Sequence, residues 1–265
     1  MDLNLTDRVF VVTAASSGLG YATARSLVAE GARVVLVARR EEVLVERARK
    51  LGTDRAVAVV GDLAEPLTPV RACEVAMETW DRLDGAFISV GGPPAGTAAT
   101  NTDDEWRGAF ESVFLAAVRT MDAVLRYAKY PETKPIAGPR GVSGPAIGLV
   151  LSSSAKLPIN DLTISNGLRP GLASLISQYS TTFGPIGARV FGLMPGKIGT
   201  DRMQQLWSLS DDPAAAKEAT EDEIPLGRIG TPEEFGRIAT FLLSPAASYV
   251  SGCVIPVDGG LIPMP

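Results

Sequence analysis

The stretch with the clearest capacity for chemistry is the turn from Thr13 to Gly20, which reads Thr-Ala-Ala-Ser-Ser-Gly-Leu-Gly. Gly18 and Gly20 allow the backbone to approach an anion closely, and free amides at the start of the following helix stabilise negative charge. A Val-rich run precedes the turn and a helical pattern follows it, which disfavours the alternative of a tight turn without a ligand. We therefore expect the turn to bind the diphosphate of a nicotinamide dinucleotide. The residues expected to contact it are Thr13, Ala15, Ser16, Ser17, Gly18, Leu19 and Gly20.

Two arginines, Arg39 and Arg40, follow the second Val-rich run. They lie about twenty residues past the turn, where folds that prefer NAD place an acid for the ribose 2′-hydroxyl. An arginine there can bind a 2′-phosphate, so the sequence favours NADP, with NAD also possible. The alternative is an exposed Arg39 paired with Glu41 or Glu42. Asp62, after the third run, is a candidate to accept from the adenine amino group, or else a turn residue or helix cap.

Three serines, Ser152 to Ser154, follow the fifth run rich in apolar residues. Sheets of this class bind ligands at the carboxyl ends of their strands, so Ser153, or a neighbouring serine, is a candidate to contact a ligand. Alternatively, these hydroxyls satisfy local backbone groups. Lys156 is the nearest cation, although a lone loop lysine is usually solvated. The chain has no histidine, which excludes His-based acid–base catalysis, Ser/His/Asp triads and His-ligated metal sites.

Short runs rich in Val and Ile must position these residues, and they alternate with helical patterns. Such alternation is typical of a parallel sheet covered by helices on both faces. The first helical pattern, Leu19–Glu30, stops at Gly31, which suits a left-handed helix end. We expect an α/β fold with one Rossmann-type, doubly wound domain over residues 1–265 and about seven strands. The predicted strands are Arg8–Thr13, Arg33–Val37, Ala56–Val60, Phe87–Val90, Ile147–Leu151, Val190–Leu193 and Val254–Val257.

Two stretches interrupt this alternation. Residues 130–145 contain several prolines, glycines and charged residues, which indicates an irregular surface loop. Residues 197–223 combine a short helical pattern, 203–209, with an acidic segment, 211–223. The position of this second stretch after the sixth strand suits a mobile substrate lid.

Composition narrows the class of protein. The net charge of −5 and the absence of a Lys/Arg-rich run argue against a nucleic-acid-binding surface. No apolar segment is long enough to span a bilayer. Cys73 and Cys253 lie far apart without a CxxC motif, which suits a reducing compartment. We expect a cytoplasmic protein that binds neither membranes nor nucleic acid.

Together these motifs resemble the short-chain dehydrogenase/reductase family, in particular its 3-oxoacyl-(acyl-carrier-protein) reductase-like branch. The resemblance covers nearly the whole chain. It rests on Thr13–Gly20, Gly61-Asp62-Leu63, Ser152–Ser154, Pro195-Gly196 with Thr200, Pro225–Glu234 and Val257–Gly260. It implies an enzyme that uses NADP(H) on a small carbonyl or alcohol substrate and forms a homodimer or homotetramer. The further cofactor contacts that it implies are Arg39, Arg40, Asp62, Leu63, Val90, Gly91, Gly92, Arg169, Pro195, Gly196, Ile198 and Thr200.

The sequence departs from this family at the catalytic positions. Where the family has a proton-donating tyrosine and, one turn later, a lysine, this chain has Ser165 and Arg169. A serine hydroxyl is a poorer proton donor than a phenol, whose pKa is about 10. Proline suits the first turn of a helix, so one interpretation starts the helix near Pro170 and leaves Ser165 on a loop. The candidate catalytic residues are Ser153, Ser165, Arg169 and Lys156.

Two other family positions lack a clear counterpart. The string Tyr130 to Lys134 spells Tyr-x-x-x-Lys, but Pro131 and Pro135 oppose a helix there, so we interpret it as a chance match. The family's asparagine falls at Ser112 or Val113.

The sequence supports two functional hypotheses. In the first, the protein is an NAD(P)(H)-dependent oxidoreductase that reduces a ketone or aldehyde, 3-oxoacyl-like under the resemblance, or oxidises the alcohol. In the second, it is a catalytically weak or silent dinucleotide-binding homologue with a sensing or structural role.

Overall fold

Seven runs of mostly β-branched and small apolar residues pair into one parallel sheet with the order β3-β2-β1-β4-β5-β6-β7. The computed structural model describes residues 1–128, 144–208 and 210–263. The predicted loop 130–145, with the Tyr130 to Lys134 string, lies outside the described residues except for 144 and 145. The strands are β1 (Val9–Thr13), β2 (Arg33–Ala38), β3 (Ala56–Val60), β4 (Gly85–Ile88), β5 (Ala146–Val150), β6 (Arg189–Pro195) and β7 (Val254–Val257).

The predicted doubly wound sheet is confirmed, and two strands differ from their predicted bounds by two residues. Strand β6 begins one residue earlier and ends two residues later than the predicted Val190–Leu193. Strand β4 begins and ends two residues earlier than the predicted Phe87–Val90. A side chain explains the early end. The Thr13 hydroxyl donates to the Ser89 carbonyl at 2.6 Å and accepts from the Ser89 amide at 2.9 Å. Because these bonds replace strand pairing at Ser89, the chain is free to leave the sheet there.

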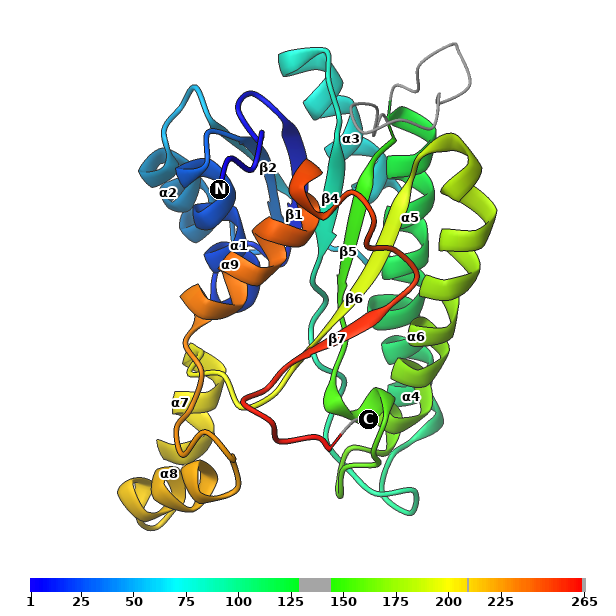
Figure 1. Ribbon diagram of the computed structural model, residues 1–265. Coiled ribbons are helices and arrows are strands. Elements are labelled where there is room, and N and C mark those ends of the chain that lie inside the picture. Colours follow the sequence, from blue (N-terminus) through cyan, green and yellow to red (C-terminus); the bar gives the residue numbers. More distant parts are fainter. Residues whose placement is uncertain (129–143, 209, 264–265) are drawn as a thin grey trace.

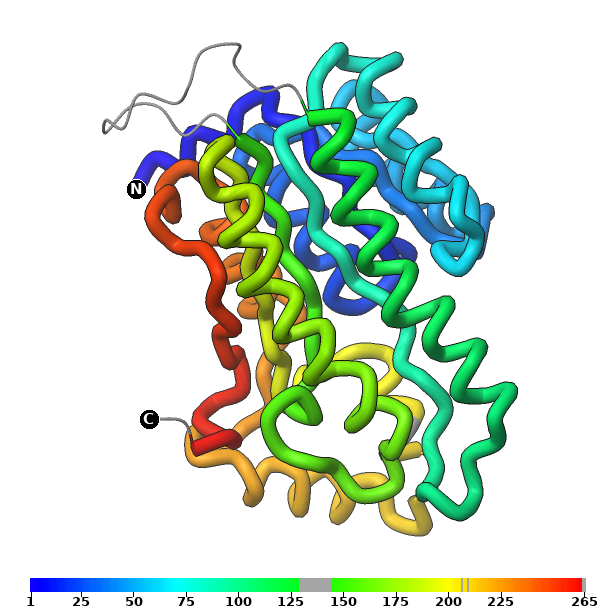
Figure 2. Tube along the Cα trace, turned by 90° about the vertical axis from the view of Figure 1, so that its right-hand side faces the viewer, coloured from blue at the N-terminus to red at the C-terminus, as the bar shows by residue number. Residues whose placement is uncertain are grey.

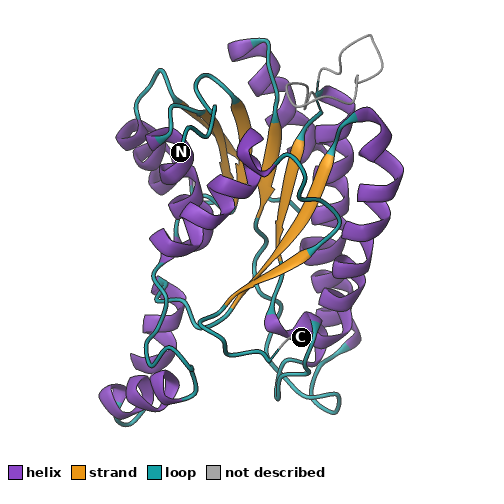
Figure 3. Cartoon of the chain, in the orientation of Figure 1, coloured by secondary structure: helices purple, strands orange, loops and turns teal. Residues whose placement is uncertain are grey.

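Helices cover both faces of the sheet (Figures 1 and 3). One apolar cluster joins the sheet to α3, α5 and α6, and a second joins it to α1, α2 and α9. Alternate residues of each strand feed alternate clusters, as in Val9 and Val11 against Phe10 and Val12. The helices are α1 (Gly18–Ala29), α2 (Glu41–Leu51), α3 (Leu67–Trp80), α4 (Asp103–Ala109), α5 (Ala116–Tyr127), α6 (Thr163–Phe183), α7 (Asp201–Ser208), α8 (Pro213–Asp222) and α9 (Pro232–Leu243).

Helix α6 corrects one interpretation of the sequence. The helix begins at Thr163 and passes through Pro170, so Ser165 lies on the helix and not on a loop. A proline inside a helix removes one backbone bond, and tertiary packing must compensate. Leu172 and Ile176 of α6 are completely buried in the core, which supplies that packing.

Two glycines bring α6 unusually close to its neighbours. A β-carbon at Gly167 would lie 2.7 Å from the Trp106 ring, and one at Gly171 would lie 3.0 Å from the Phe114 ring. Trp106 belongs to α4, and Phe114 to the π-helical turn Phe110–Leu115 that follows α4. The small residues therefore fix α6 against the region in which the family's asparagine was expected.

At the amino edge of the sheet, a buried arginine forms hydrogen bonds to backbone carbonyl groups at the end of α9. Arg189 begins β6, and its guanidinium lies among the carbonyl groups that end α9. A helix leaves its last carbonyl groups without partners and with partial negative charge, which a cation satisfies. Arg189 donates to the carbonyl oxygens of Leu242, Leu243, Ser244, Ala247 and Val250 at 2.8–3.3 Å.

Helices α7 and α8 extend from the carboxyl edge of the sheet, below the two helical layers in Figure 1 and under the body of the molecule in Figure 2. The indole of Trp207 donates to the Thr220 hydroxyl at 3.2 Å and joins the two helices. A short parallel bridge between Ile198 and Gly230 ties together the two ends of this excursion. Within the described residues no helix is both long and apolar enough to cross a membrane.

Candidate functional site

A cleft of about 660 Å³ opens at the carboxyl edge of the sheet, over β1 and its neighbours β2 and β4. The direction of strand crossovers reverses between β1 and β4, and doubly wound sheets bind ligands at this point. Residues of the turn after β1, of the ends of β2, β3 and β4, and of α7 line the cleft. They are Ala14, Ser16, Ser17, Val37, Ala38, Arg39, Arg40, Gly61, Asp62, Leu63, Gly91, Gly92, Ser112, Arg202 and Gln205.

The turn after β1 has the geometry expected of a diphosphate cradle. Gly20 lies so close to β1 that a β-carbon would stand 2.7 Å from the carbonyl oxygens of Thr13 and Ala14. Gly18 adopts a left-handed φ of 57°. Ala14 has a φ of 48°, which an L-residue with a β-carbon adopts only at an energetic cost. The turn thus keeps a glycine-like backbone although its first glycine is replaced.

Not every residue of the turn reaches the cleft. Ser16 and Ser17 line it, whereas Thr13 and Ala15 are fully buried. The Thr13 hydroxyl is occupied by the Ser89 backbone, and the Ala15 amide donates to the Val37 carbonyl at 3.1 Å. Thr13 and Ala15 therefore shape the turn in this structure. Leu19 packs against the core beneath it.

The end of the cleft next to β2 is strongly basic. Arg40 donates to the hydroxyls of both Ser16 and Ser17 at 3.0 Å. These two hydrogen bonds hold one side of the turn in place. Arg39 is 77% exposed, and its ion pair is with Asp62 at 3.6 Å, not with Glu41 or Glu42. An exposed pair at that distance is weak, so both groups remain available to a ligand. Leu63 lines the same end.

A hydroxyl pair lies at the carboxyl end of β5. The Ser154 and Ser165 hydroxyl oxygens are 2.8 Å apart, and both side chains are buried. Ser153, the serine singled out from the sequence, is half-buried, and the Ser152 hydroxyl accepts from the Ser154 amide at 3.2 Å. Lys156 is exposed at the end of this turn. The structure therefore brings Ser154, rather than Ser153, against Ser165.

Arg169 lies one helical turn after Ser165 and is only 4% exposed. Its Nη1 donates to the Val150 carbonyl at 2.8 Å, and its Nε has no partner within the part of the chain that the structure describes. Burial, reinforced by the nearby cation of Arg202, lowers the pKa of Arg169 to about 10. The group stays charged at neutral pH, so the end of β5 carries a buried cation whose hydrogen-bonding capacity is unfilled.

Several residues of the cleft were not among the predicted contacts, and Ser112 was left undecided. Ala14, Val37, Ala38 and Gly61 adjoin predicted contacts, whereas Arg202 and Gln205 come from α7, where the sequence offered only a short helical pattern, 203–209, without a motif. Ser112 also lines the cleft, while Val113 is buried in the core. Both lie in the π-helical turn, a feature that often marks functional sites. Of the two candidates for the family's asparagine position, only Ser112 faces the cleft.

The remaining predicted contacts divide between the cleft and its margins. Gly91 and Gly92 line the cleft, and Val90 packs against the core. Thr200 approaches the diphosphate turn, since a β-carbon at Gly18 would lie 3.7 Å from its methyl group. Pro195 ends β6, and the following Gly196 donates its amide to the Val257 carbonyl at 3.0 Å.

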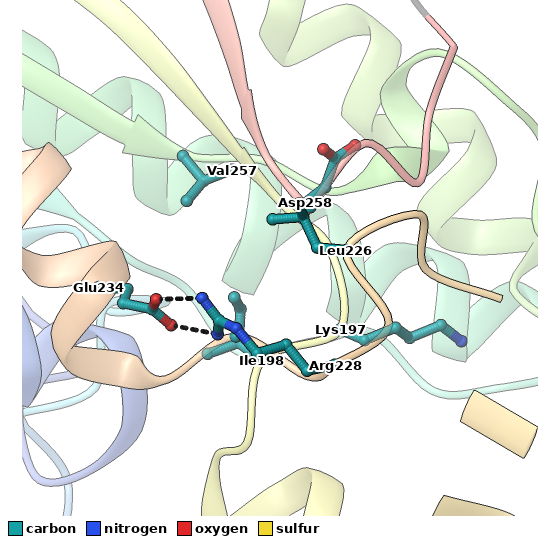
Figure 4. Close-up of a pocket in the computed structure, with 9 residues that line it drawn as sticks. Lys197, Ile198, Leu226, Arg228, Glu234, Val257 and Asp258 are labelled. Carbon is teal, nitrogen blue, oxygen red and sulfur yellow. Dashed lines mark hydrogen bonds and ion pairs between the residues drawn. The ribbon is translucent and has the colours of Figure 1, made fainter. Parts of the chain in front are cut away.

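A separate cavity of about 150 Å³ lies beyond this margin (Figure 4). Lys197, Ile198, Leu226, Val257 and Asp258 line it. Arg228 and Glu234 lie across it from β7 and form a two-pronged ion pair, with distances of 2.7 and 3.0 Å. This pair and the amide of Thr231 lower the pKa of the Glu234 carboxyl to about 2. Ile198 thus belongs to the base of the α7–α8 excursion and does not line the main cleft.

Comparison with known proteins agrees with this architecture. A family model described as enoyl-(acyl carrier protein) reductase matches residues 13–262. The A-factor type gamma-butyrolactone 1'-reductase (1S-forming) of Streptomyces virginiae is 31% identical over 97% of this chain and 96% of its own. Cyclohexanol dehydrogenase of Rhodococcus sp. is 27% identical, with 98% of each chain covered. The crystal structure of L-sorbose reductase from Gluconobacter frateurii complexed with NADPH and L-sorbose superposes with a TM-score of 0.89, 28% identity and 100% coverage of both chains.

Proposed function

Because the chain belongs to the short-chain dehydrogenase/reductase family of NAD(P)-dependent oxidoreductases, we propose that it reduces a small ketone or aldehyde with NADPH, or oxidises the corresponding alcohol. The observation that carries this proposal is the Ser154–Ser165 hydroxyl pair at the end of β5, with the unsatisfied Arg169 one turn further along α6. A polarising hydroxyl and a cation are the groups that carbonyl reduction needs around the reacting oxygen.

The cleft fits a dinucleotide. Gly20 leaves no space for a side chain between the turn and α1, so the amides at the start of α1 can approach a diphosphate. The volume of about 660 Å³ lies in the range of ligand-binding clefts. The nicotinamide supplies or accepts the hydride when it is bound. Gly91, which has open space around it, leaves room in the part of the cleft next to β4, whereas the Arg202 guanidinium covers Gly92.

We assign the acid–base chemistry to three residues of this chain. In the hydroxyl pair one serine donates to the other, and the free hydrogen of the pair can donate to the substrate oxygen. Arg169 stays protonated and stabilises negative charge on that oxygen. Lys156 is exposed at the mouth of this turn, where a proton from solvent can replace the one transferred. Loss of the family's phenol would slow proton transfer, by about a hundred- to ten-thousand-fold where such a group is simply removed.

Cofactor choice follows from the basic end of the cleft. The exposed guanidinium of Arg39, with Arg40 beside it, is placed to bind a 2′-phosphate, so the proposal includes a preference for NADPH over NADH. Asp62 would then exchange its weak ion pair with Arg39 for a contact to the adenine amino group. Arg39→Ala should weaken NADPH binding and leave NADH binding nearly unchanged, as measured by fluorescence titration.

The proposal extends to assembly and location. We expect a homodimer or homotetramer in the cytoplasm, a view supported by exposed apolar side chains such as Phe110 and Tyr249 and by the free thiols of Cys73 and Cys253. Light scattering coupled to size exclusion measures the assembly directly, and a monomer at micromolar concentration would contradict this part.

The central test is turnover. NADPH oxidation is followed with a panel of neutral ketones, aldehydes and 3-oxo acids, and Ser154→Ala should lower kcat at least about a hundredfold. Ser174→Ala, at an exposed position of the same helix α6, is the matched control and should behave as wild type. Tight NADPH binding without oxidation of any compound would favour the catalytically silent alternative, which the dehydrogenases and reductases among the relatives do not favour.

A further inference from the structure

The two halves of the cleft carry cations for different reasons. Because the sheet runs β3-β2-β1-β4-β5, an adenosine group recognised by Arg39 and Asp62 lies on the β2–β3 side of the diphosphate turn. The nicotinamide half then lies on the β4–β5 side. A dinucleotide has no phosphate beyond its diphosphate on that side. Cations there are therefore not explained by the adenosine 2′-phosphate.

Arg202 is one such cation. It lies in the first turn of α7 and lines the cleft together with Gly91, Gly92 and Ser112. Its guanidinium packs directly against Gly92, where a β-carbon would collide with it. Among residues 1–128, 144–208 and 210–263, no carboxylate forms an ion pair with Arg202. Among the described residues that line the cleft, Asp62 is the only acid, and it lies at the opposite end beside Arg39.

Arg169 is the second cation. It is buried beside the end of β5, donates one hydrogen bond to Val150, and has an unpartnered Nε. Arg202 lies near enough for its charge to disfavour the protonated form of Arg169. Arg202 lines the cleft, whereas Arg169 is buried and is not among the described residues that line it. Two guanidinium groups that repel each other raise the free energy of the unliganded site. An anion bound there lowers the electrostatic free energy of both guanidinium groups.

We propose that the part of the cleft next to β4 binds the anionic group of the substrate, a carboxylate or phosphate of a carbonyl compound, through Arg202 of α7, with the buried Arg169 as a second cation nearby. This inference rests on the proposed function and adds a substrate class to it. In the reduction, the carbonyl carbon gains a hydride and its oxygen gains a proton, while the anionic group remains unchanged. Gln205, one turn after Arg202, supplies a neutral hydrogen-bonding group on the same wall.

The cofactor diphosphate is a second source of the same chemistry, and the structure gives reasons to favour the substrate. The diphosphate turn already offers the amides of α1 and the hydroxyls of Ser16 and Ser17. Arg202 packs against Gly92, in the segment that follows β4. Its helix α7 also belongs to the segment 197–223, which the sequence predicts as a substrate lid. An arginine on this lid would couple lid position to substrate charge.

The test compares an acid with its uncharged ester. We expect the full chain with NADPH to reduce 3-oxobutanoate with a kcat/KM at least about tenfold above that of ethyl 3-oxobutanoate, since one charge-assisted hydrogen bond is worth this factor. Arg202→Gln should lower the acid-to-ester ratio of kcat/KM about tenfold, and Arg202→Lys should lower it less. Lys217→Gln removes a charge from α8 outside the cleft and is the control that should preserve the ratio.

Several outcomes would overturn the inference. A wild-type ratio near one would do so, as would an Arg202→Gln variant that weakens NADPH binding about tenfold and leaves the ratio unchanged, since the arginine would then serve the diphosphate. Absence of turnover with every compound would instead reject the proposed function. In that event, binding of 3-oxobutanoate and its ester to the protein with NADP decides the charge preference by calorimetry, with equal affinities counting against Arg202.

Discussion

Arg169 and Arg189 are both buried, and burial lowers the pKa of each to about 10, yet their surroundings differ. Arg189, at the amino end of β6, donates to five carbonyl oxygens that α9 and the following turn leave free. Arg169, at the carboxyl end of β5, has one protein acceptor. Among the described residues the Nε of each arginine has no partner, so the contrast lies in the other guanidinium nitrogens, which have five acceptors in Arg189 and one in Arg169. Under the proposed function, a ligand at the carboxyl edge of the sheet supplies acceptors that the protein does not.

The largest expected effect is that of Arg189→Met. Removal of the guanidinium leaves several carbonyl oxygens at the end of α9 buried without donors, and each unsatisfied group costs about 1–3 kcal/mol. We expect the free energy of unfolding to fall by roughly 3 kcal/mol or more, as measured by urea denaturation. NADPH affinity of the folded fraction should not change. A loss below about 1 kcal/mol would show that this end of the molecule is not completed by Arg189.

Arg169→Met should have the opposite effects: little change in stability and a large loss of turnover. The wild-type cation incurs a desolvation cost with little compensation, so its replacement by an apolar side chain should change stability by less than about 1 kcal/mol or increase it. Turnover should fall by about a hundredfold or more, because the charge opposite the substrate oxygen is lost. Urea denaturation and NADPH oxidation measure the two effects. A large stability loss with normal turnover would place Arg169 in the same class as Arg189.

A smaller effect concerns the strained turn. Ala14 has a left-handed φ of 48°, and glycine adopts this conformation without the clash of a β-carbon. Ala14→Gly should therefore raise the free energy of unfolding by about 1 kcal/mol, offset in part by the greater entropy of the unfolded chain. Thermal melting without cofactor checks the sign. A clear destabilisation would mean that the turn is not strained at Ala14 and that the carboxyl edge is better satisfied than we infer.

The smallest effect involves an exposed pair. The pKa of Glu234 is lowered to about 2 by Arg228 and Thr231, so its contribution to stability is present above its unfolded pKa of 4.5 and is lost as pH falls towards 2. Glu234→Gln should cost below about 1 kcal/mol at pH 7, since the carboxylate is 40% exposed. The difference from wild type should shrink by pH 3 in urea denaturation. A pH-independent difference would exclude the ion pair as its cause.

The sequence predicted the sheet because its signal is local. Runs such as Ala56–Val60 and Val254–Val257 are short, apolar and bounded by turn residues, and both strands occupy the predicted residues. Residues 163–183 were harder, because Pro170 opposes a helix locally and the compensation comes from distant packing by residues such as Leu172. Propensity is a weak prior where tertiary contacts decide.

The site residues divide in the same way, into those that local sequence predicts and those that only contacts between distant elements bring together. The strand–turn–helix geometry around Thr13–Gly20 was predictable because its glycines, its strand and its helix are adjacent in sequence. The Ser154–Ser165 contact spans eleven residues, and the choice of Ser154 over Ser153 depends on how the turn after β5 winds. Arg202 has no motif around it, and only the fold of α7 brings it to Gly92. Contacts between separate elements were beyond what periodicity can predict.

The bridge between Ile198 and Gly230 affects how the site can evolve. It closes the segment between those residues at its base, so insertions or replacements within the segment need not disturb β6 or α9. The entropic penalty of a longer closed segment grows only with the logarithm of its length. This segment can therefore change in evolution almost independently of the rest of the fold. Such changes would alter the molecules that are recognised and leave the turn after β1 and the ends of β2 and β3 as they are.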